Sequence, residues 1–232
     1  MKTIGLIGGM SWESSLEYYR MINKLVKKEL GEPHSAELIM YSVDFAEYEE
    51  LQHQGNWGAL TAKMIELAKK VEAAGADIIL ICTNTMHKMA AEVEENINIP
   101  LLHIADAAAA AIKAEKIEEV ALLGTKFTME EDFYKKRLKD EHGIEVIIPD
   151  KRDREIVHNV IYKELISGLI KDESREKFKE IIKKLKKRGA EGVVLGCTEI
   201  PLLIKDKDSP IPVFDTSAIH AAKAVEFALK LE

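Results

Sequence analysis

One segment of this chain occurs twice, about half a chain apart, and the repeat limits which folds are possible. Residues 75–85 read GADIILICTNT and residues 189–199 read GAEGVVLGCTE, and the two align without a gap. In this alignment Thr83, rather than Cys82, falls on Cys197. Each segment contains an apolar run that follows glycine and ends at polar residues, which is typical of a buried strand.

Two further pairs of segments repeat in the same order. Residues 4–9 resemble residues 120–125, and residues 99–102 resemble residues 211–214. All three pairs are about 112 to 116 residues apart, well above the usual period of a solenoid. A single match would mean little, but three in one order at nearly one spacing predict a duplicated lobe.

Strand-like and helix-like segments alternate along the whole chain. This alternation is typical of parallel sheets covered by helices on both faces. We therefore predict an α/β fold of two similar parallel-sheet lobes, with residues 1–98 plus 214–232 in the first and 99–213 in the second. Equivalent strand ends would face each other across a shared cleft, where we expect the active site.

The helical segments are predicted from periodicity and from their start and stop signals. Thr128 and Glu131 have the spacing of a capping box, which places a helix start there. The expected helices cover residues 13–30, 56–74, 85–95, 106–115, 129–141, 153–170, 173–188 and 217–231.

Composition excludes several classes of protein. The net charge of −7 and the pI of about 5.6 argue against nucleic acid or an anionic membrane as the main partner. The sequence has no apolar run of about 18 residues, and two cysteines do not make a disulfide scaffold. The start runs into a strand without a signal-peptide pattern, so a cytoplasmic location is expected.

Polar residues follow several of the predicted strands. In parallel sheets, ligands bind at the carboxyl ends of the strands. The residues at such ends are Thr83, Asn84, Thr85, Thr125, Cys197 and Thr198.

Cys197 is the strongest candidate for chemistry. A thiol at a strand end, before a helix, can have a lowered pKa and act as a base or nucleophile. The alternative is a small buried apolar residue, as free cysteines often are. The Thr198-Glu199 pair that follows favours a functional role.

The turn after the first strand offers an anion site. Gly5, Gly8 and Gly9 fit neither a dinucleotide-binding fingerprint nor a phosphate-binding loop. We interpret Met10 and Ser11 instead as a turn whose backbone N–H groups, at a helix start, can hold a carboxylate.

Uncharged donors complete the candidate site. Asn84, Thr85 and Thr198 could hold a substrate carboxylate, although the same residue types also favour helix caps. His87 could be a base or a satisfied core or surface residue. The histidines lack metal-ligand spacing, and no nucleophile elbow is present.

Four motifs in this order resemble the aspartate/glutamate racemase family, which includes hydantoin racemases. They are Gly8-Gly9-Met10-Ser11, Asn84-Thr85 with His87, Gly124-Thr125, and Gly196-Cys197-Thr198-Glu199. The resemblance covers essentially the whole chain. It implies two α/β lobes with the site between them, a C-terminal helix that packs on the first lobe, and often a homodimer.

The family resemblance implies chemistry without a cofactor. One cysteine removes the α-proton of an amino acid, and a second returns a proton to the opposite face. Donors around the carboxylate stabilise the planar carbanion. The resemblance therefore implies a racemase whose partner is a small amino acid, aspartate or glutamate.

The chain departs from this family pattern at the first cysteine. Thr83 occupies that position, and Cys82 is expected to point away because side chains alternate along a strand. A hydroxyl is a far weaker acid and base than a thiol. We therefore expect Cys197 to be the main base and Thr83 to complete the proton relay poorly, so that one enantiomer is preferred.

The second departure concerns the substrate side chain. Aspartate racemases of the family carry a basic pair, of which Lys163 matches the lysine, although it could also be a solvated helix lysine. The segment after the second strand has no arginine, and Gln52 could donate a hydrogen bond there instead. The alternatives that stay open are another carbanion enzyme, namely a hydantoin racemase, decarboxylase or cis–trans isomerase, and a non-catalytic binder of a small carboxylate.

Overall fold

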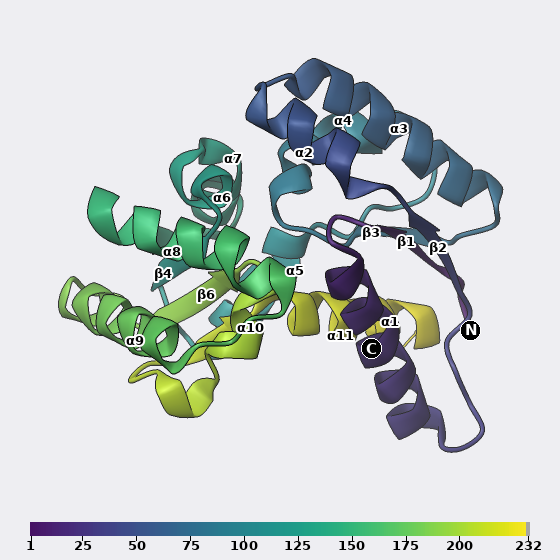
Figure 1. The fold of residues 1–232 in the computed structure, drawn as a ribbon. Coiled ribbons are helices and arrows are strands. Elements are labelled where there is room, and N and C mark those ends of the chain that lie inside the picture. Colours follow the sequence, from purple (N-terminus) through teal and green to yellow (C-terminus); the bar gives the residue numbers. More distant parts are fainter. Residues whose placement is uncertain (231–232) are drawn as a thin grey trace. The chain divides into compact units, whose positions relative to one another are not determined.

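The computed structural model describes residues 1–230, which form two compact units (Figure 1). Unit 1 comprises Met1–Ile104 and the chain from His220 onward, and unit 2 comprises Ala105–Ile219. These boundaries lie a few residues after those expected from the sequence. They fall at the first residue of α5 (Ile104–Ala114) and within α11 (Thr216–Leu229).

Unit 1 is built on a three-stranded parallel sheet. Its strand order is β2-β1-β3, and Leu101 extends it by an isolated parallel bridge to Ile79. The strand interiors are almost wholly apolar, as expected for a sheet that is covered on both faces. The strands are β1 (Ile4–Gly8), β2 (Leu38–Ser42) and β3 (Ile78–Ile81).

Helices cover both faces of this sheet. Ile7, Ile79 and Ile81 pack in one core with residues of α3, whereas Ile4 and Leu80 pack in another with α1 and α11. Figure 1 shows α3 on one side of the strands and α1 with α11 on the other. The remaining elements are α1 (Trp12–Leu30), α2 (Phe45–His53), α3 (Trp57–Ala73), η1 (Thr85–Met89) and α4 (Ala90–Glu94).

Unit 2 is built on a four-stranded parallel sheet of order β5-β4-β6-β7. Ala121, Leu123, Val193 and Leu195 pack in one core with residues of α8 and α9. The alternate residues of these strands are also fully buried, so both faces are covered. The strands are β4 (Glu119–Gly124), β5 (Glu145–Ile147), β6 (Gly192–Gly196) and β7 (Val213–Asp215).

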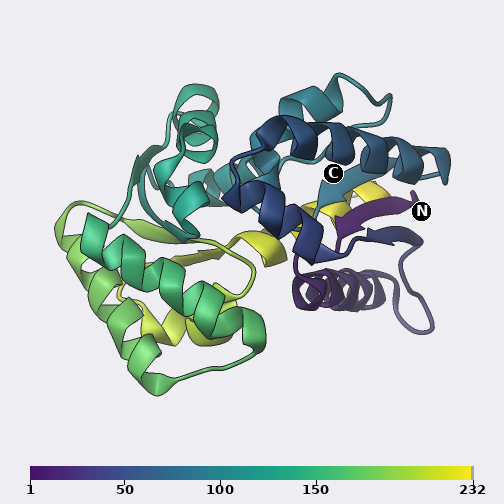
Figure 2. The same ribbon diagram turned by 45° about the horizontal axis from the view of Figure 1, so that its top comes forward.

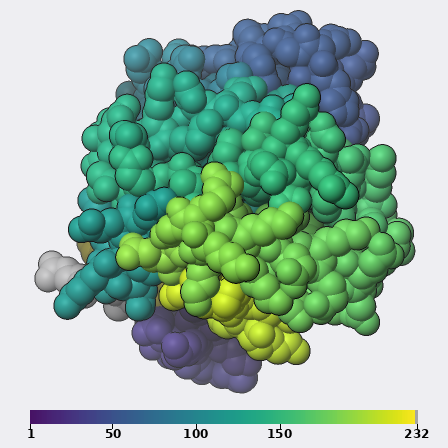
Figure 3. Space-filling model, turned by 90° about the vertical axis from the view of Figure 1, so that its left-hand side faces the viewer, coloured from purple at the N-terminus to yellow at the C-terminus, as the bar shows by residue number. Residues whose placement is uncertain are grey.

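The helices α8 and α9 lie side by side over this core (Figure 2). Both helices are rich in charged residues, and Figure 3 shows this part of the chain, in green, on the surface. The helical elements of unit 2 after α5 are α6 (Lys126–Glu130), α7 (Asp132–Lys136), the π-helical turn η2 (Arg137–Glu141), α8 (Lys151–Lys163), η3 (Leu165–Ser167), α9 (Asp172–Lys187), α10 (Ile200–Leu203) and η4 (Asp206–Asp208).

Equivalent residues of the two sheets make equivalent hydrogen bonds, which confirms the predicted pair of similar lobes. The Asp77 carboxylate accepts from the Thr3 amide at 2.7 Å, and the Glu191 carboxylate accepts from the amide of Glu119, the counterpart of Thr3, at 3.3 Å. The amides of Asp77 and Glu191 in turn donate to the backbone carbonyl groups of Thr3 and Glu119. The repeated sequence therefore encodes one supersecondary unit twice.

Three of the predicted helices are interrupted. The helix expected over 85–95 is the 3₁₀ turn η1 followed by α4, and the one expected over 153–170 stops at Lys163. The helix expected over 129–141 is divided into α6, α7 and η2. The capping box at Thr128 and Glu131 was wrong, because Thr125 caps α6 and Glu131 has extended backbone angles. Helix α2 was missed.

Two further findings concern the described helices. Leu231, the last residue of the expected final helix, lies outside the described residues. Among residues 1–230, no helix combines the length and apolar character that crossing a membrane requires.

Candidate active site

Two strand ends of unit 1 bring five candidate residues to one edge of its sheet. Strands β1 and β3 are neighbours with Ile7 beside Ile81, so the residues that follow them lie at the same edge. The Thr83 side chain is partly exposed there, whereas its neighbours in the turn are buried. The candidates at this edge are Met10, Ser11, Thr83, Asn84 and Thr85.

The turn between β1 and α1 is held by serine side chains. Ser11 is the N-cap of α1 and accepts from the Ser14 amide at 3.3 Å. The Gly9 amide donates to Ser15 Oγ at 2.7 Å, and that hydroxyl donates to the Ser11 carbonyl at 2.9 Å. These bonds place the N-terminus of a 19-residue helix, with its partial positive charge, at the strand edge.

The turn after β3 is tied to α1 and to the helix turn that follows it. Ser14 Oγ donates to the Cys82 carbonyl at 2.9 Å, and His87 Nδ1 lies 2.9 Å from the next carbonyl, that of Thr83. Two consecutive peptide groups are therefore held by buried side chains. The sequence did not predict the Ser14 contact, because the serine and the strand end are 68 residues apart.

Asn84 does not cap a helix through its side chain: it has helical backbone angles, and η1 has no side-chain cap bond. Cys82 is buried against residues of α1 and α11, as the alternation along the strand predicts. Burial raises the pKa of the Cys82 thiol far above its ordinary value. Cys82 is therefore a core residue without thiolate character.

Three buried histidines lie behind the Thr83 turn. The ring of His87 lies 4.7 Å from that of His103 and 5.8 Å from that of His220, measured between centroids. His220 Nδ1 is 2.9 Å from the Tyr18 hydroxyl, and its Nε2 is 2.8 Å from the Leu102 carbonyl. A carbonyl only accepts, so Nε2 carries the proton and Nδ1 accepts from the tyrosine.

This arrangement predicts acid sensitivity of unit 1. Burial first, and His87 second, lower the pKa of His220 to about 3. The unfolded chain takes up a proton at this residue below about pH 6.5, while the folded protein does not until about pH 3, so stability is lost as the pH falls through this window. We expect His220 alone to remove about 2 kcal/mol from the free energy of unfolding between pH 7 and pH 5.

Urea unfolding followed by tryptophan fluorescence checks this prediction, because Trp12 and Trp57 both belong to unit 1. The free energy of unfolding should differ between pH 7 and pH 5 by about 2 kcal/mol less in His220→Gln than in the wild type, whatever the stability of the variant itself. An unchanged difference in the variant would contradict the prediction.

Unit 2 brings a second group of candidates to the edge of its own sheet. Strands β4 and β6 are neighbours with Gly124 beside Gly196, so Thr125 and Cys197 follow at the same edge. A Cβ on Gly196 would lie 2.9 Å from a Leu122 methyl group and 3.2 Å from the Leu123 carbonyl oxygen, so a larger residue before the thiol would require its neighbours to shift. Thr125 also caps α6, accepting from the Thr128 amide at 3.4 Å.

The Cys197 thiol donates a hydrogen bond to a buried carboxylate. Its Sγ lies 2.9 Å from Glu199 Oε2, and the Thr198 hydroxyl donates to the same oxygen at 2.8 Å. Cys197 and Glu199 are 8% and 6% exposed. Sequence reasoning named Glu199 as a sign of function but missed this contact, which depends on the sharp turn after β6.

The predicted lowering of the Cys197 pKa was wrong. Burial raises the pKa of this thiol well above its ordinary value, and the charge of Glu199 raises it further. The next helix, α10, begins only at Ile200 and has four residues, so the thiol does not have the helix terminus that the prediction assumed. The resting group is a neutral thiol with a proton acceptor beside it.

The two residues suggested for the substrate side chain lie on separate elements. Gln52, on α2, is 4% exposed, and its Nε2 is 3.2 Å from the sulfur of Met86. Lys163 is exposed at the last residue of α8.

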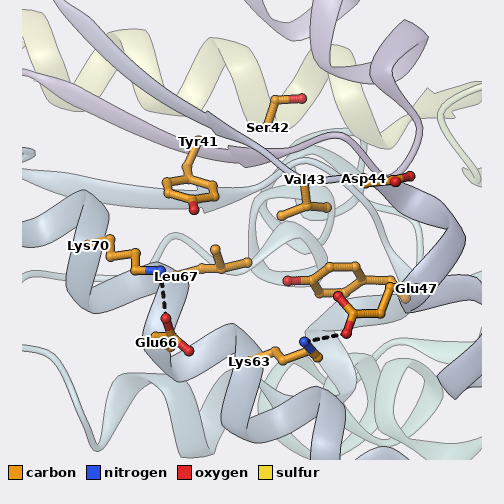
Figure 4. A pocket seen from close by; sticks show the side chains of 10 residues that line it. Tyr41, Ser42, Val43, Asp44, Glu47, Lys63, Glu66, Leu67 and Lys70 are labelled. Carbon is orange, nitrogen blue, oxygen red and sulfur yellow. Dashed lines mark ion pairs between the residues drawn. The ribbon is translucent and has the colours of Figure 1, made fainter.

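A cavity of about 300 Å³ opens in unit 1 beside the end of β2 (Figure 4). Two lysines of α3 reach it, and each is paired with a carboxylate: Lys63 with Glu47 at 2.8 Å, and Lys70 with Glu66 at 2.6 Å. The residues lining this cavity include none of the sequence candidates. Among residues 1–230, no group of three or more histidine, cysteine or acidic residues could hold a metal ion.

The fold and the two strand edges define an α/β protein of two similar parallel-sheet units, with a hydroxyl after β3 and a thiol after β6 at aligned positions. The profile of the Asp/Glu/hydantoin racemase family matches residues 7–224, and the chain belongs to this family. The resemblance seen in the motifs is thereby confirmed. Membership supports an isomerase of the racemase type.

Relatives agree with this assignment over nearly the whole chain. A crystal structure from Yersinia pestis with a provisional Asp/Glu racemase description is 52% identical, covers 99% of this chain and 100% of its own, and has a TM-score of 0.93. An aspartate racemase homologue from Pyrococcus horikoshii OT3 is 39% identical over 99% and 100% of the two chains, with a TM-score of 0.87. The broad specificity amino-acid racemase RacX of Bacillus subtilis is 24% identical over 96% of each chain.

Proposed function

We propose that this chain is a cofactor-independent racemase of aspartate or glutamate, with Cys197 as its main base and Thr83 acting on the opposite face of the substrate. The observation that carries the proposal is the thiol of Cys197 donating to the buried carboxylate of Glu199 at a strand end. The 39% identical aspartate racemase homologue supports an acidic substrate.

Glu199 can accept the proton of the buried thiol and so form the thiolate. Transfer of the thiol proton to Glu199 leaves one negative charge on the pair, so no further charge is buried in the step. The thiolate then takes the α-proton of the amino acid as a general base. The charge of Glu199 raises the pKa of the thiol, and this contribution disappears when Glu199 itself takes the proton.

The return of a proton from the other face completes the reaction. The Thr83 hydroxyl donates its proton to the α-carbon, and solvent carries the proton held by Glu199 back to the Thr83 oxygen. The hydroxyl gives up its proton reluctantly, so this half of the reaction is slow. The product has the opposite hand, and every group regains its starting proton.

Fixed donors stabilise the planar carbanion. The N-terminus of α1 at Ser11 and the polar side chains of Asn84 and Thr85 would hold the substrate carboxylate, and Thr125 and Thr198 would add donors from unit 2. Gln52 and Lys163 would contact the side-chain carboxylate, for which the Gln52 amide must leave Met86.

A second candidate function follows from one residue. Thr83 stands where the family pattern has a cysteine, which favours a non-catalytic binder of a small carboxylate if the hydroxyl delivers no proton. Exchange of the α-proton in deuterated water, followed for each enantiomer separately, separates the two. Binding without exchange selects the binder, and equal exchange from both enantiomers would refute the unequal pair of bases.

Thr83→Cys is expected to speed turnover of the disfavoured enantiomer about 10-fold or more, because a thiol exchanges protons far more readily than a hydroxyl. Chiral chromatography of reactions started from each pure enantiomer measures the effect. Thr83→Val, which removes the hydroxyl, is the matched control and should lower inversion. No change or a loss in Thr83→Cys would argue against Thr83 facing the reacting carbon.

A further inference from the structure

His87 makes two directional hydrogen bonds that define its protonation. The Ile104 amide donates to His87 Nε2 at 3.2 Å, and an amide can only donate, so Nε2 accepts. The other nitrogen, Nδ1, lies 2.9 Å from the Thr83 carbonyl, which can only accept, so Nδ1 carries the proton. His87 is 3% exposed and neutral, and both nitrogens are engaged. It is therefore not the base that its position in the sequence allowed.

His87 joins its own turn to a segment further along the chain, because Thr83 is four residues before it and Ile104 is 17 residues after it. Ile104 begins α5. The ring of His220 contacts that of His87 and is hydrogen-bonded to Tyr18 of α1. The Thr83 carbonyl is thus connected, through one imidazole, to the first residue of α5. The preceding carbonyl, that of Cys82, accepts from Ser14 Oγ at 2.9 Å.

We propose that His87 is a positioning residue for Thr83: its Nδ1–H bond sets the orientation of the Thr83 peptide and thereby aims the hydroxyl at the α-carbon. This inference rests on the proposed function, in which Thr83 returns a proton. Thr83 is the last residue before the buried turn, and its side chain is partly exposed while Asn84 and Thr85 are buried. Rotation of its peptide would move the hydroxyl without unpacking the core.

The expected effect is large because proton transfer is sensitive to geometry. A displacement of about 1 Å costs about 100-fold in rate when the reacting atoms are misplaced. The Cys197 side of the reaction lies in unit 2 and does not use this bond. Loss of the His87 bond should therefore affect proton return by Thr83 and spare proton removal by Cys197.

Two substitutions of His87 separate its two hydrogen bonds. The shorter His87→Asn places an amide N–H near the Nδ1 position and keeps a donor for the Thr83 carbonyl. The longer His87→Gln places its carbonyl near Nε2, accepts from Ile104, and loses the donor to Thr83. Both replacement side chains end in an amide group and therefore have the same polarity, and they differ in length by one methylene group.

The measurement uses the whole chain and the enantiomer whose α-proton Cys197 removes. This is the enantiomer whose α-proton no longer exchanges with solvent deuterium (wash-out) in Cys197→Ser. In deuterated water each turnover either retains the hand, when Cys197 returns the deuteron, or inverts it, when Thr83 does. We expect the ratio of inversion to retention to fall about 100-fold in His87→Gln and to stay within about 5-fold of wild type in His87→Asn. Total wash-out should change little in either variant.

Each other result overturns the positioning role. Equal loss of inversion and retention in both variants would indicate a merely structural residue. A wild-type protein that shows no exchange at all would instead reject the proposed function. Nitrogen NMR of wild-type imidazole-labelled protein is independent of the variants: it should show His87 protonated at Nδ1 alone near neutral pH, and the other tautomer or an imidazolium would reject the inference.

Discussion

Cys197→Ser is expected to lower racemisation by about 10²–10⁴-fold, the usual contribution of a general base. Serine is close in size to cysteine, and its hydroxyl can keep the hydrogen bond to Glu199, so the packing after β6 should survive. The hydroxyl gives up its proton far less readily than the thiol, and burial raises that cost further. Rates of α-proton exchange by NMR, per folded molecule, measure the loss.

Cys82→Ala is the control for this experiment. It removes the other thiol of the chain, which packs between β3 and the helices α1 and α11. The variant should lose some stability and keep its exchange rate per folded molecule. A similar loss of rate in the two variants, or full activity in Cys197→Ser, would contradict the assignment of the base.

Gly9→Ala is expected to lower the free energy of unfolding by about 2 to 5 kcal/mol. Gly9 has a φ of +93°, and a Cβ there would lie 2.3 Å from the Val43 carbonyl oxygen and 2.4 Å from its nitrogen. Both neighbours are backbone atoms, and the Val43 amide is already bonded to the Gly8 carbonyl at 3.0 Å. Neither can move without opening the turn that carries Ser11.

Gly55→Ala isolates the backbone part of this cost. Gly55 also has a positive φ, +67°, but a Cβ there would meet nothing within 4 Å. We expect this control to lose only about 1 to 2 kcal/mol. Urea unfolding of the two variants gives the comparison. If both lost the same free energy of unfolding, the close approach of Val43 would add no cost, which would contradict the prediction.

The repeat was the most informative part of the sequence. It predicted two similar lobes and aligned Thr83 with Cys197, and the matching hydrogen bonds of Asp77 and Glu191 show that the two lobes share this strand arrangement. The helices predicted from periodicity were less accurate: Glu131 breaks one of them, and Met89 marks a change from 3₁₀ to α geometry in another. Propensity is too weak to predict such breaks, because tertiary packing overrides it.

The candidate site was predicted only in part for a related reason. The strand-end residues could be found, since they follow apolar runs along the chain. The histidine cluster could not, since Tyr18 and His220 are 202 residues apart and His220 and Leu102 are 118 apart. No local pattern links such residues.

The order of residues along the chain thus established the strands, their parallel arrangement and the polar groups at their ends, because burial of short apolar runs depends on near neighbours. The folded arrangement decided the ionisation of Cys197 and the tautomer of His87. Both depend on which dipoles and charges touch a buried group, and on how much water is excluded from it. A thiol in the same sequence motif would have been acidic beside a long helix, and is held neutral here by burial and by Glu199.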